Sequence, residues 1–191
     1  MSFQPQLDEA IAVLQASVAL TPAIDEITAL AADALLAGHT LYTAGNGGSA
    51  ADALHLAEEL IGRYRGNRRP LAAICLNADT GALTCIANDF GYDEVFARQL
   101  AALGKPGDVL VVFSTSGNSP NILNVLRTAR AKGVISIALL GKDGGTARTL
   151  ADHALIVPSN NTARIQEVHT LILHAICEEV EQRLANVAAG M

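Results

Sequence analysis

The sequence contains no tryptophan and few other aromatic residues, with four phenylalanines and three tyrosines among 191 residues. Half of the residues are nonetheless hydrophobic, so Ala, Leu, Val and Ile must fill the core. Small aliphatic side chains of this kind are usual where helices pack closely on a parallel sheet. A chain of this length is typical of one domain, which we place at residues 1–191.

Basic residues are also scarce, since 13 Lys and Arg face 19 Asp and Glu and the net charge is −6. Binding nucleic acid by neutralising its phosphates requires clustered Lys and Arg, so we expect no nucleic-acid partner. One short basic cluster is present, and we interpret it as a solvated turn rather than a contact for an anion. Its members are Arg63, Arg65, Arg68 and Arg69.

The cysteines form neither a disulfide framework nor a metal-ligand pattern. Cys75, Cys85 and Cys177 are odd in number and each lies in an apolar run, so we expect small buried side chains. The N-terminal segment carries Asp8 and Glu26 instead of a basic stretch followed by an apolar one, which argues against a signal peptide. No apolar run approaches the roughly 20 residues that cross a bilayer. We therefore expect a cytoplasmic protein with no membrane partner.

The first part of the chain has apolar residues at helical spacing, over residues 6–36. Pro22 separates two predicted helices, because proline is tolerated in a first turn and disruptive further in. Gly38 ends the second of them. We expect residues 1–38 to form an N-terminal helical segment with enough apolar surface to pack on a neighbouring subunit.

From residue 39 onward, short β-rich runs alternate with helical segments. The predicted strands are residues 40–43, 72–76, 109–114, 135–140 and 155–157. The predicted helices are residues 50–62, 94–103, 121–132, 146–150 and 164–184. This alternation implies right-handed crossovers and a parallel sheet covered on both faces. We therefore expect residues 39–191 to form an α/β core, a three-layer α/β/α sandwich with a five-stranded parallel sheet.

A glycine-rich loop runs from the first predicted strand straight into a helix, with the sequence Gly45-Asn46-Gly47-Gly48-Ser49. Its glycines let the backbone approach a ligand, and Ser49 can cap the helix and offer its hydroxyl. A helix N-terminus also favours an anion. An ordinary tight turn explains this loop equally well. It fits the dinucleotide pattern G-x-G-x-x-A only loosely, because the first acidic residue after the second strand, Asp79, comes too late.

A hydroxyl-rich loop follows the third predicted strand and again leads into a helix, with the sequence Ser114-Thr115-Ser116-Gly117-Asn118-Ser119. Hydroxyls and backbone amides can hold a phosphate without Lys or Arg. Ligands of such sheets bind beyond the carboxyl ends of the strands, where both loops are expected to lie. No Gly-Lys-Ser/Thr follows either loop, which excludes a Walker A motif. Two loops of this kind favour a phosphate site.

Two predicted helices carry histidines beside carboxylate or amide groups. His55 and Glu59 are four residues apart and share a helical face, which suits a zinc ion or a base oriented by its neighbour. In the last helix, Gln166 precedes His169 by three residues and His174 by eight. Spacing alone does not choose between these two histidines, and one of them is expected to be a hydrogen-bonded core residue.

The two loops and the β/α alternation resemble the sugar isomerase (SIS) domain, a flavodoxin-like fold. That group contains phosphosugar isomerases, sugar-responsive regulators and non-catalytic scaffolds, so the fold alone does not define the chemistry. The chain from residue 45 to about 184 is similar to the phosphoheptose isomerase family. The matching segments are GNGGSAADALHLAEEL, ANDFG, GDVLVVFSTSGNS, GKDGG and ARIQEVH.

The resemblance implies a zinc ion held by His55, Glu59, Gln166 and His174. The scaffold of the same group lacks the pair that corresponds to Glu59 and His174. The resemblance further implies aldose–ketose isomerisation of sedoheptulose 7-phosphate to D-glycero-D-manno-heptose 7-phosphate, a precursor of surface glycans, with Glu59 and His174 as catalytic base and acid.

The expected substrate contacts and assembly also come from the resemblance. The phosphate contacts are Ser49, Ser114, Thr115, Ser116 and Ser119, and the sugar contacts are Asn46, Gly47, Gly48, Asn88, Asp89 and Gln166. A homotetramer with sites between subunits is implied, in which His55 or Asp89 serves a neighbour's site. The alternatives are an isomerase of another phosphosugar, a non-catalytic scaffold that binds a replication or regulatory protein, and, more distantly, a nicotinamide-dependent oxidoreductase.

Overall fold

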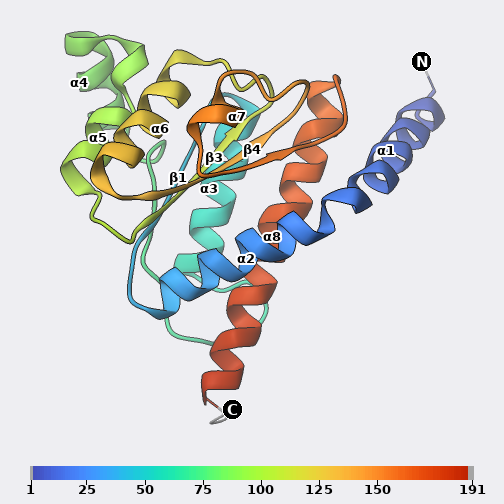
Figure 1. The fold of residues 1–191 in the computed structure, drawn as a ribbon, viewed down its shortest axis with the longest axis horizontal. Helices are drawn as coiled ribbons and strands as arrows, with labels where there is room; N and C mark the ends of the chain where they lie inside the picture. Colours follow the sequence, from blue (N-terminus) through green and yellow to red (C-terminus); the bar gives the residue numbers. More distant parts are fainter. Residues whose placement is uncertain (1, 189–191) are drawn as a thin grey trace.

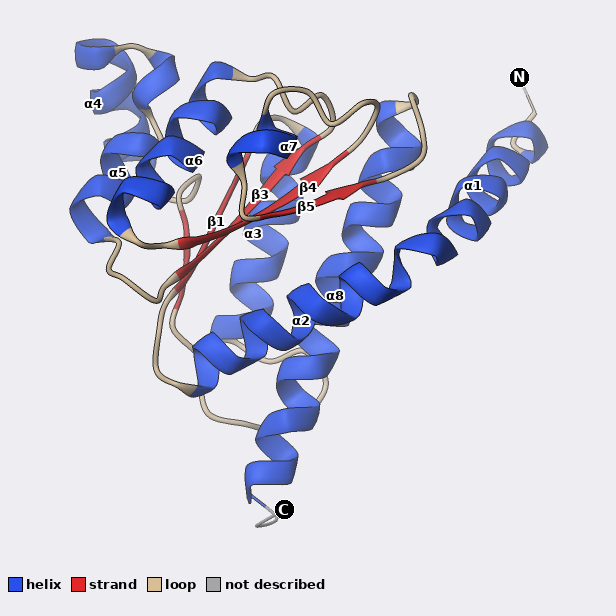
Figure 2. Cartoon of the chain, viewed as in Figure 1, coloured by secondary structure: helices blue, strands red, loops and turns tan. Residues whose placement is uncertain are grey.

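A computed structural model describes residues 2–188, in which a five-stranded parallel sheet lies between helices (Figures 1 and 2). The predicted domain of residues 1–191 also includes residues 1 and 189–191, which lie outside the described range. The strand order is β2-β1-β3-β4-β5, the flavodoxin-like order. The strands are β1 (Leu41–Gly45), β2 (Ala73–Cys75), β3 (Val109–Ser114), β4 (Ile135–Leu140) and β5 (His153–Ile156). All neighbouring strands pair in parallel, as the sequence predicted.

Helices cover both faces of the sheet, and each face has its own hydrophobic core. Successive side chains of a strand point to opposite faces. In β3, Val109, Val111 and Phe113 accordingly enter one core, while Leu110 and Val112 enter the other. The first core is closed by α2 (Thr21–Leu36), α3 (Gly48–Ile61) and α8 (Thr162–Ala188). The second is closed by α4 (Thr80–Phe90), α5 (Ala97–Leu103), α6 (Pro120–Lys132) and α7 (Ala147–Leu150). Val95 and Phe96, between the 3₁₀ helix η2 (Tyr92–Glu94) and α5, also belong to it.

The N-terminal helices α1 (Gln4–Ala16) and α2 follow one another through the short 3₁₀ helix η1 (Ser17–Leu20), and α1 projects from the body of the protein (Figure 1). Pro22 lies in the first turn of α2, as predicted. Ile27, Ala31 and Leu35 of α2 are buried in the core that includes α8. In α1, by contrast, none of the side chains that the structure describes is buried. The domain core therefore begins with α2.

The stretch Gln4–Leu36 is long and apolar enough, by length and composition alone, to span a membrane. The sequence-based expectation that no apolar run approaches this length is therefore wrong. Core helices of soluble proteins meet the same two measures, and the α2 half of this stretch packs in the core.

Helix α4 was not predicted from the sequence, and it makes one further expectation, that Cys85 is buried, wrong. Asn88, Asp89 and Phe90 form its last turn. Asp79 caps its N-terminus by accepting a hydrogen bond of 2.9 Å from the backbone N–H of Ala82. Cys85 also lies on α4 and is exposed, whereas Cys75 and Cys177 are buried as expected.

Candidate active site

A pocket of about 210 Å³ lies beyond the carboxyl ends of β1 and β3. These strands are neighbours, and the chain continues from β1 to β2 on one side and from β3 to β4 on the other. Such a reversal of strand order is where parallel α/β sheets bind ligands. The pocket is lined by Asn46, Gly48, Ser49, Phe113, Ser114, Thr115, Ser116, Ser119, Thr162 and Gln166.

Three helices begin at this pocket. Gly48 is the first residue of α3, Ser119 is the N-cap of α6, and Thr162 is the first residue of α8. Each helix N-terminus presents unpaired backbone N–H groups and a partial positive charge. Within the described residues, no Lys or Arg lines the pocket. Hydroxyls and helix termini are therefore the groups that can hold an anion here.

The hydroxyl-rich loop is shaped by its own side chains. Ser114 Oγ accepts a hydrogen bond of 3.1 Å from Gly117 N–H, and Ser116 Oγ accepts one of 3.3 Å from Asn118 N–H. Gly117 has a φ of +63°, and a Cβ there would collide with the carbonyl oxygen of Gly144. The GKDGG motif, residues Gly141–Gly145, therefore packs directly against this loop.

Asn118 and Gly117 also connect this loop to the start of α7. The Oδ1 of Asn118 accepts a hydrogen bond of 2.9 Å from Thr146 N–H, and the carbonyl of Gly117 accepts another of 2.9 Å from Ala147 N–H. Hydrogen bonds within the loop and to the start of α7 thus hold its shape without a ligand.

The glycine-rich loop is held by amide side chains that the sequence did not single out. Asn77 binds both backbone groups of Gly45, accepting from its N–H at 3.1 Å and donating to its carbonyl at 2.9 Å. Asn46 exchanges two hydrogen bonds with Asn121, and its Oδ1 also accepts one from the hydroxyl of Tyr92. These contacts fix the Asn46 amide at the pocket.

The expectation that Ser49 caps α3 is wrong. Among the described residues, neither the N-terminus of α3 nor that of α6 receives a side-chain capping hydrogen bond. Ser49 is buried, and both it and Ser119 line the pocket. Their hydroxyls are consequently not committed to helix capping, which suits them to a ligand.

A second group of polar side chains lies further along α3, toward its C-terminal end. His55 Nε2 is 3.3 Å from Glu59 Oε1, and the ligand atoms of His55, Glu58 and Glu59 all lie within 4.8 Å of one another. His174 of α8 packs edge-on against His55, with ring centroids 5.1 Å apart. The structure thus brings together three of the four predicted metal ligands, and adds Glu58, which was not predicted.

Gln166 lies nearer to the pocket than the other predicted ligands. Its amide packs against Gly48, where a Cβ would collide with it. Gln166 is eight residues from His174, which is about 12 Å along a helix. The residue is therefore at the end of α8 that lines the pocket, as its predicted role in substrate binding requires.

The choice between His169 and His174 is made by burial. His169 is fully buried, its Nε2 lies 3.1 Å from the carbonyl oxygen of Leu140, and its ring packs edge-on against Phe113. Burial lowers the pKa of His169 to about 4, so its imidazole is neutral at neutral pH. His169 is the core histidine expected from the sequence, and His174 is the one that faces His55.

Asp52 connects α3 to α8 between the pocket and the histidines. Its Oδ1 accepts a hydrogen bond of 2.9 Å from the hydroxyl of Thr170, while its Oδ2 has no hydrogen-bond partner among the described residues. Burial raises the pKa of this carboxyl, and the hydrogen bond from Thr170 and the nearby His55 only partly oppose that effect.

Most predicted substrate contacts gather at the pocket, but Asn88 and Asp89 do not. Both are exposed at the end of α4, where Asn88 Nδ2 donates a hydrogen bond of 2.8 Å to Asp89 Oδ1. Gly47 is exposed in the glycine-rich loop beside the pocket. Phe113 and Thr162 line the pocket but were not predicted. Position at a strand end or a helix start is the signal that could have found them.

The chain is similar to known proteins over most of its length. The family model described as SIS domain matches residues 7–141. A phosphoheptose isomerase of Paramagnetospirillum magneticum is 50% identical over 186 residues, which are 95% of this chain and 97% of that protein. A phosphoheptose isomerase of Citrifermentans bemidjiense is 53% identical over 165 residues, 86% of each chain.

Solved structures lead to the same family. The phosphoheptose isomerase of Neisseria gonorrhoeae superposes with a TM-score of 0.89 at 40% identity, covering 94% of this chain and 96% of that one. That of Francisella tularensis gives a TM-score of 0.87 at 34% identity, covering 95% and 100%. On this fold, this pocket and these likenesses, the chain belongs to the phosphoheptose isomerase family of SIS-domain proteins.

Proposed function

We propose that this chain is an aldose–ketose isomerase that interconverts sedoheptulose 7-phosphate and D-glycero-D-manno-heptose 7-phosphate. One observation carries the proposal: a hydroxyl-lined pocket and a His–Glu–His group lie along the same pair of helices, α3 and α8. His55 is seven residues from Gly48, which is about 10 Å along α3. A sugar phosphate can therefore place its phosphate in the pocket and its reactive end beside the histidines.

The donor set of the second group suits zinc, which binds His nitrogen and carboxylate oxygen. His55 and Glu59 lie within ion-binding reach of each other, and His174 packs against His55. We assign the zinc ligands to His55, Glu59 and His174, with Gln166 approaching from the pocket end of α8. A zinc ion bound there supplies Lewis-acid polarisation of the substrate carbonyl and its neighbouring hydroxyl.

Moving a proton between C1 and C2 through an enediol(ate) requires a base and an acid. From aldose to ketose, Glu59 takes the proton from C2 while His174 donates a proton to the C1 oxygen, which gives the enediol. Glu59 then gives its proton to C1 and His174 takes the proton of the C2 hydroxyl, so both residues return to their starting state. The two thus exchange roles between the steps, and the reverse direction runs through the same steps backward. Both residues are half-buried, so water reaches them only in part. His55 contacts both of them, which fixes their relative position.

Binding of the substrate's phosphate orients the rest of the sugar in the site. Ser49, Ser114, Thr115, Ser116 and Ser119 bind the phosphate with hydroxyls and with the helix termini behind them, while Asn46, Gly47, Gly48 and Gln166 contact the sugar. Binding energy at a remote phosphate is used to hold the reactive carbons in place, so losing a phosphate contact reduces turnover as well as affinity.

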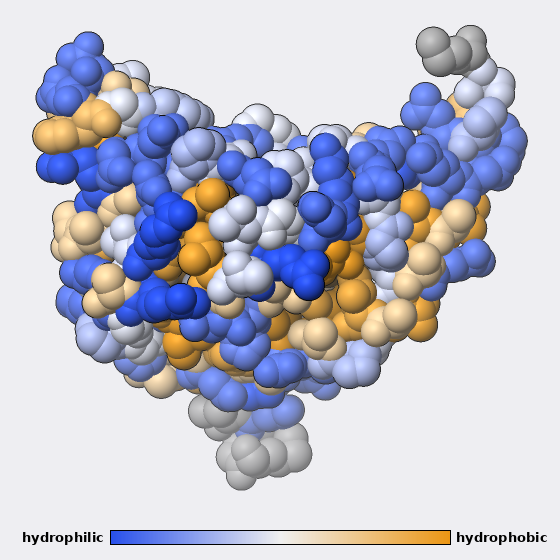
Figure 3. Space-filling model, turned by 45° about the horizontal axis from the view of Figure 1, so that its top comes forward, coloured by the Kyte–Doolittle hydropathy of each residue, from blue (hydrophilic) through white to orange (hydrophobic). Residues whose placement is uncertain are grey.

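We assign Asn88 and Asp89 to the site of a neighbouring subunit in a homotetramer. Both are exposed at the end of α4, beside the exposed side chains of Phe90 and Tyr92. Helix α1 also exposes Leu7, Ile11 and Leu14, and Figure 3 shows apolar atoms gathered on the surface beside the projecting N-terminal helix. These surfaces support assembly, and we place the enzyme in the cytoplasm.

The test is to incubate the purified protein of known zinc content with sedoheptulose 7-phosphate and to measure the aldose product. Glu59→Gln and His174→Ala are assayed beside it, with Glu179→Gln as a control that changes a carboxylate of α8 outside the site. Product from the wild type and the control alone supports the proposal and both assignments. Bound zinc without product indicates another phosphosugar, and the absence of both favours a non-catalytic scaffold.

A further inference from the structure

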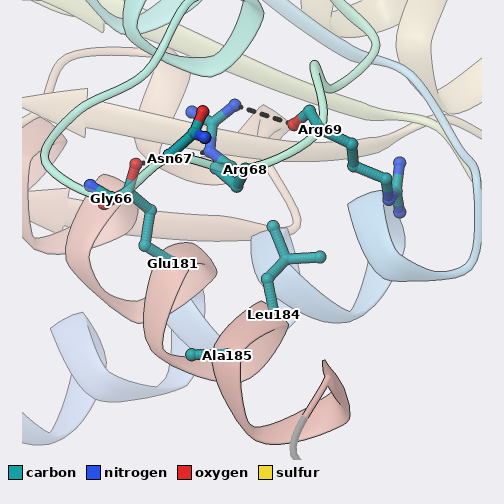
Figure 4. A pocket seen from close by; sticks show the side chains of 7 residues that line it. All are labelled: Gly66, Asn67, Arg68, Arg69, Glu181, Leu184 and Ala185. Atoms are coloured by element: carbon teal, nitrogen blue, oxygen red, sulfur yellow. Dashed lines mark hydrogen bonds and ion pairs between the residues drawn. The ribbon is translucent and has the colours of Figure 1, made fainter.

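Arg68 was expected in a solvated turn, and that expectation is wrong, because its side chain is only 8% exposed. Its guanidinium donates hydrogen bonds to the carbonyl oxygens of Glu59 at 2.5 Å, Leu60 at 2.8 Å and Gly62 at 3.2 Å. A fourth bond of 3.1 Å reaches the carbonyl of Arg69, drawn in Figure 4. Since the last carbonyls of a helix have no partner within it, Arg68 closes the C-terminal end of α3.

Glu181 holds the same segment from the side of α8. Its carboxylate accepts hydrogen bonds from the backbone N–H groups of Tyr64, Arg65 and Gly66, at 3.0, 3.0 and 2.8 Å. Its Oε1 also lies 3.3 Å from Arg68 Nε, close enough for an ion pair though not aligned as a hydrogen bond. Both side chains are among those that line a cavity of about 370 Å³, which are drawn in Figure 4.

The carboxylate of Glu181 is well matched to this position. Burial opposes its ionisation, but the three backbone N–H groups and the Arg68 guanidinium outweigh that effect and hold the pKa of the Glu181 carboxyl below its ordinary value. It is therefore charged at neutral pH, and its hydrogen bonds are charge-assisted.

This network joins the two residues that the proposed mechanism uses. Glu59 is one of the residues whose carbonyl Arg68 binds, so the guanidinium contacts the turn that carries the base. Tyr64, whose N–H is held by Glu181, stacks on the ring of His174 with centroids 5.5 Å apart. The segment between α3 and β2 thus contacts both residues' surroundings. Arg68 binds the backbone of Glu59, the proposed base, and Tyr64 stacks on the ring of His174, the proposed acid.

We propose that Arg68 and Glu181 are positioning residues of this isomerase, holding the end of α3 that carries Glu59 at a fixed distance from His174 on α8. The inference rests on the proposed function, because Arg68 and Glu181 would position the two residues that we assign as base and acid. Neither residue touches the phosphate pocket. Glu59 is eleven residues from Gly48, about 16 Å along α3, so a change at this end leaves phosphate binding largely untouched.

A neighbouring ion pair provides a matched control. Arg65 and Glu178 join the same segment to the same helix at 2.7 Å, but their side chains are 68% and 54% exposed. Exposed ion pairs contribute little to stability or position. Glu178→Gln removes this pair without altering the carbonyls of α3 or the amides that Glu181 binds.

The experiment measures kcat and KM for sedoheptulose 7-phosphate, the melting temperature and the bound zinc for wild type, Arg68→Lys, Glu181→Gln, their double variant and Glu178→Gln. Lysine keeps the positive charge of Arg68 but lacks the planar guanidinium that donates hydrogen bonds to several carbonyl oxygens at once. Glutamine keeps an oxygen that accepts backbone hydrogen bonds. Should Arg68→Lys fail to fold, Glu181→Gln gives the same readout.

We expect kcat to fall about tenfold or more in Arg68→Lys and Glu181→Gln, with KM within about twofold of wild type, because misplacing a reacting group by an ångström affects the chemical step most. The double variant should be little worse than either single one, since both act through one network. A kcat within about twofold of wild type in folded variants, or a fall shared by Glu178→Gln, overturns the inference alone. A wild type without turnover overturns the proposed function, and the inference with it.

Discussion

Asn46 and Asn121 exchange two hydrogen bonds of 2.9 Å, the Nδ2 of each donating to the Oδ1 of the other. The pair connects the glycine-rich loop after β1 to the first turn of α6 after β3, so it joins the two loops that form the pocket. Tyr92 adds a third hydrogen bond, 3.0 Å from its hydroxyl to Asn46 Oδ1. Because Asn121 is fully buried, a change there acts on Asn46 without removing a residue that lines the pocket.

Replacing Asn121 with aspartate should weaken binding of the sugar phosphate. The carboxylate still accepts from Asn46 Nδ2 but no longer donates to its Oδ1, and it adds a negative charge beside the pocket that we assign to a phosphate. We expect KM to rise about tenfold or more, which is about 1.4 kcal/mol and within the usual cost of a lost buried hydrogen bond. Steady-state kinetics measure the change.

Asn67→Asp is the matched control for that variant. It makes the same chemical change at an exposed residue beyond the other end of α3, and we expect KM to stay within about twofold of wild type. An equal rise of KM in both variants would indicate a general effect of charge and would argue against a role for the Asn46–Asn121 pair.

Gly117→Ala should destabilise the protein and impair phosphate binding. The residue has a φ of +63°, which costs a side chain about 1–2 kcal/mol, and the new Cβ would also collide with Gly144. Gly38→Ala is the control, because Gly38 has a φ of +89° but nothing within 4 Å of a Cβ. Thermal melts should show a clearly larger loss for Gly117→Ala, and only that variant should raise KM. Equal losses would mean that the contact with Gly144 is unimportant.

The parts of this fold that could be predicted are those set by local pattern. Both loops that line the pocket are recognisable because each follows an apolar β-rich run and leads directly into a helix, and β3 and β4 have the predicted bounds. Helix α4 was missed because its sequence, TGALTCIANDF, contains Thr, Gly, Asn and Asp, which are typical of turns. Its helix is nevertheless capped by Asp79 and packs Leu83 and Ile86 against the second core.

The parts that could not be predicted depend on partners far away in the chain. In the sequence, nothing distinguishes Arg68 from the surface arginines near it. Its burial depends on Glu181, which α8 places beside it in the folded chain. Thr162 is unremarkable in sequence, and only the start of α8 at the pocket makes it a lining residue. His169 lies three residues after Gln166 and His174 eight, and this spacing does not choose between them. Packing of the sheet on α8 decides which one is buried.

Zinc should stabilise the wild-type protein, independently of any assay of turnover. A ligand at one hundred times its Kd adds about 2.7 kcal/mol, which raises the Tm of a chain of this size by roughly 5–10 °C. We expect zinc titrated into metal-free protein to produce such a shift in the wild type. His55→Ala and Glu59→Gln should remove most of it, since both take a donor from the group.

His39→Ala is the control for the zinc titration. His39 is partly exposed and lies 3.7 Å from Asp108, away from the His55 group, so its loss should leave the zinc-dependent shift intact. A shift that persists in His55→Ala, or that disappears in His39→Ala, would contradict the assignment of the metal site to α3.

His169 should make the protein less stable as the pH falls below neutral. Its pKa is about 4 in the folded state and about 6.5 in the unfolded chain, so the unfolded state binds the proton first. The contribution is therefore complete above pH 6.5 and is lost as the pH falls toward 4, amounting to about 2 kcal/mol between pH 7.5 and 5. His169→Gln can keep a hydrogen bond to Leu140 without titrating. Urea unfolding at both pH values should show a decline that is smaller in the variant by about this amount, and an identical decline in the two proteins would show that burial of His169 does not govern the acid sensitivity.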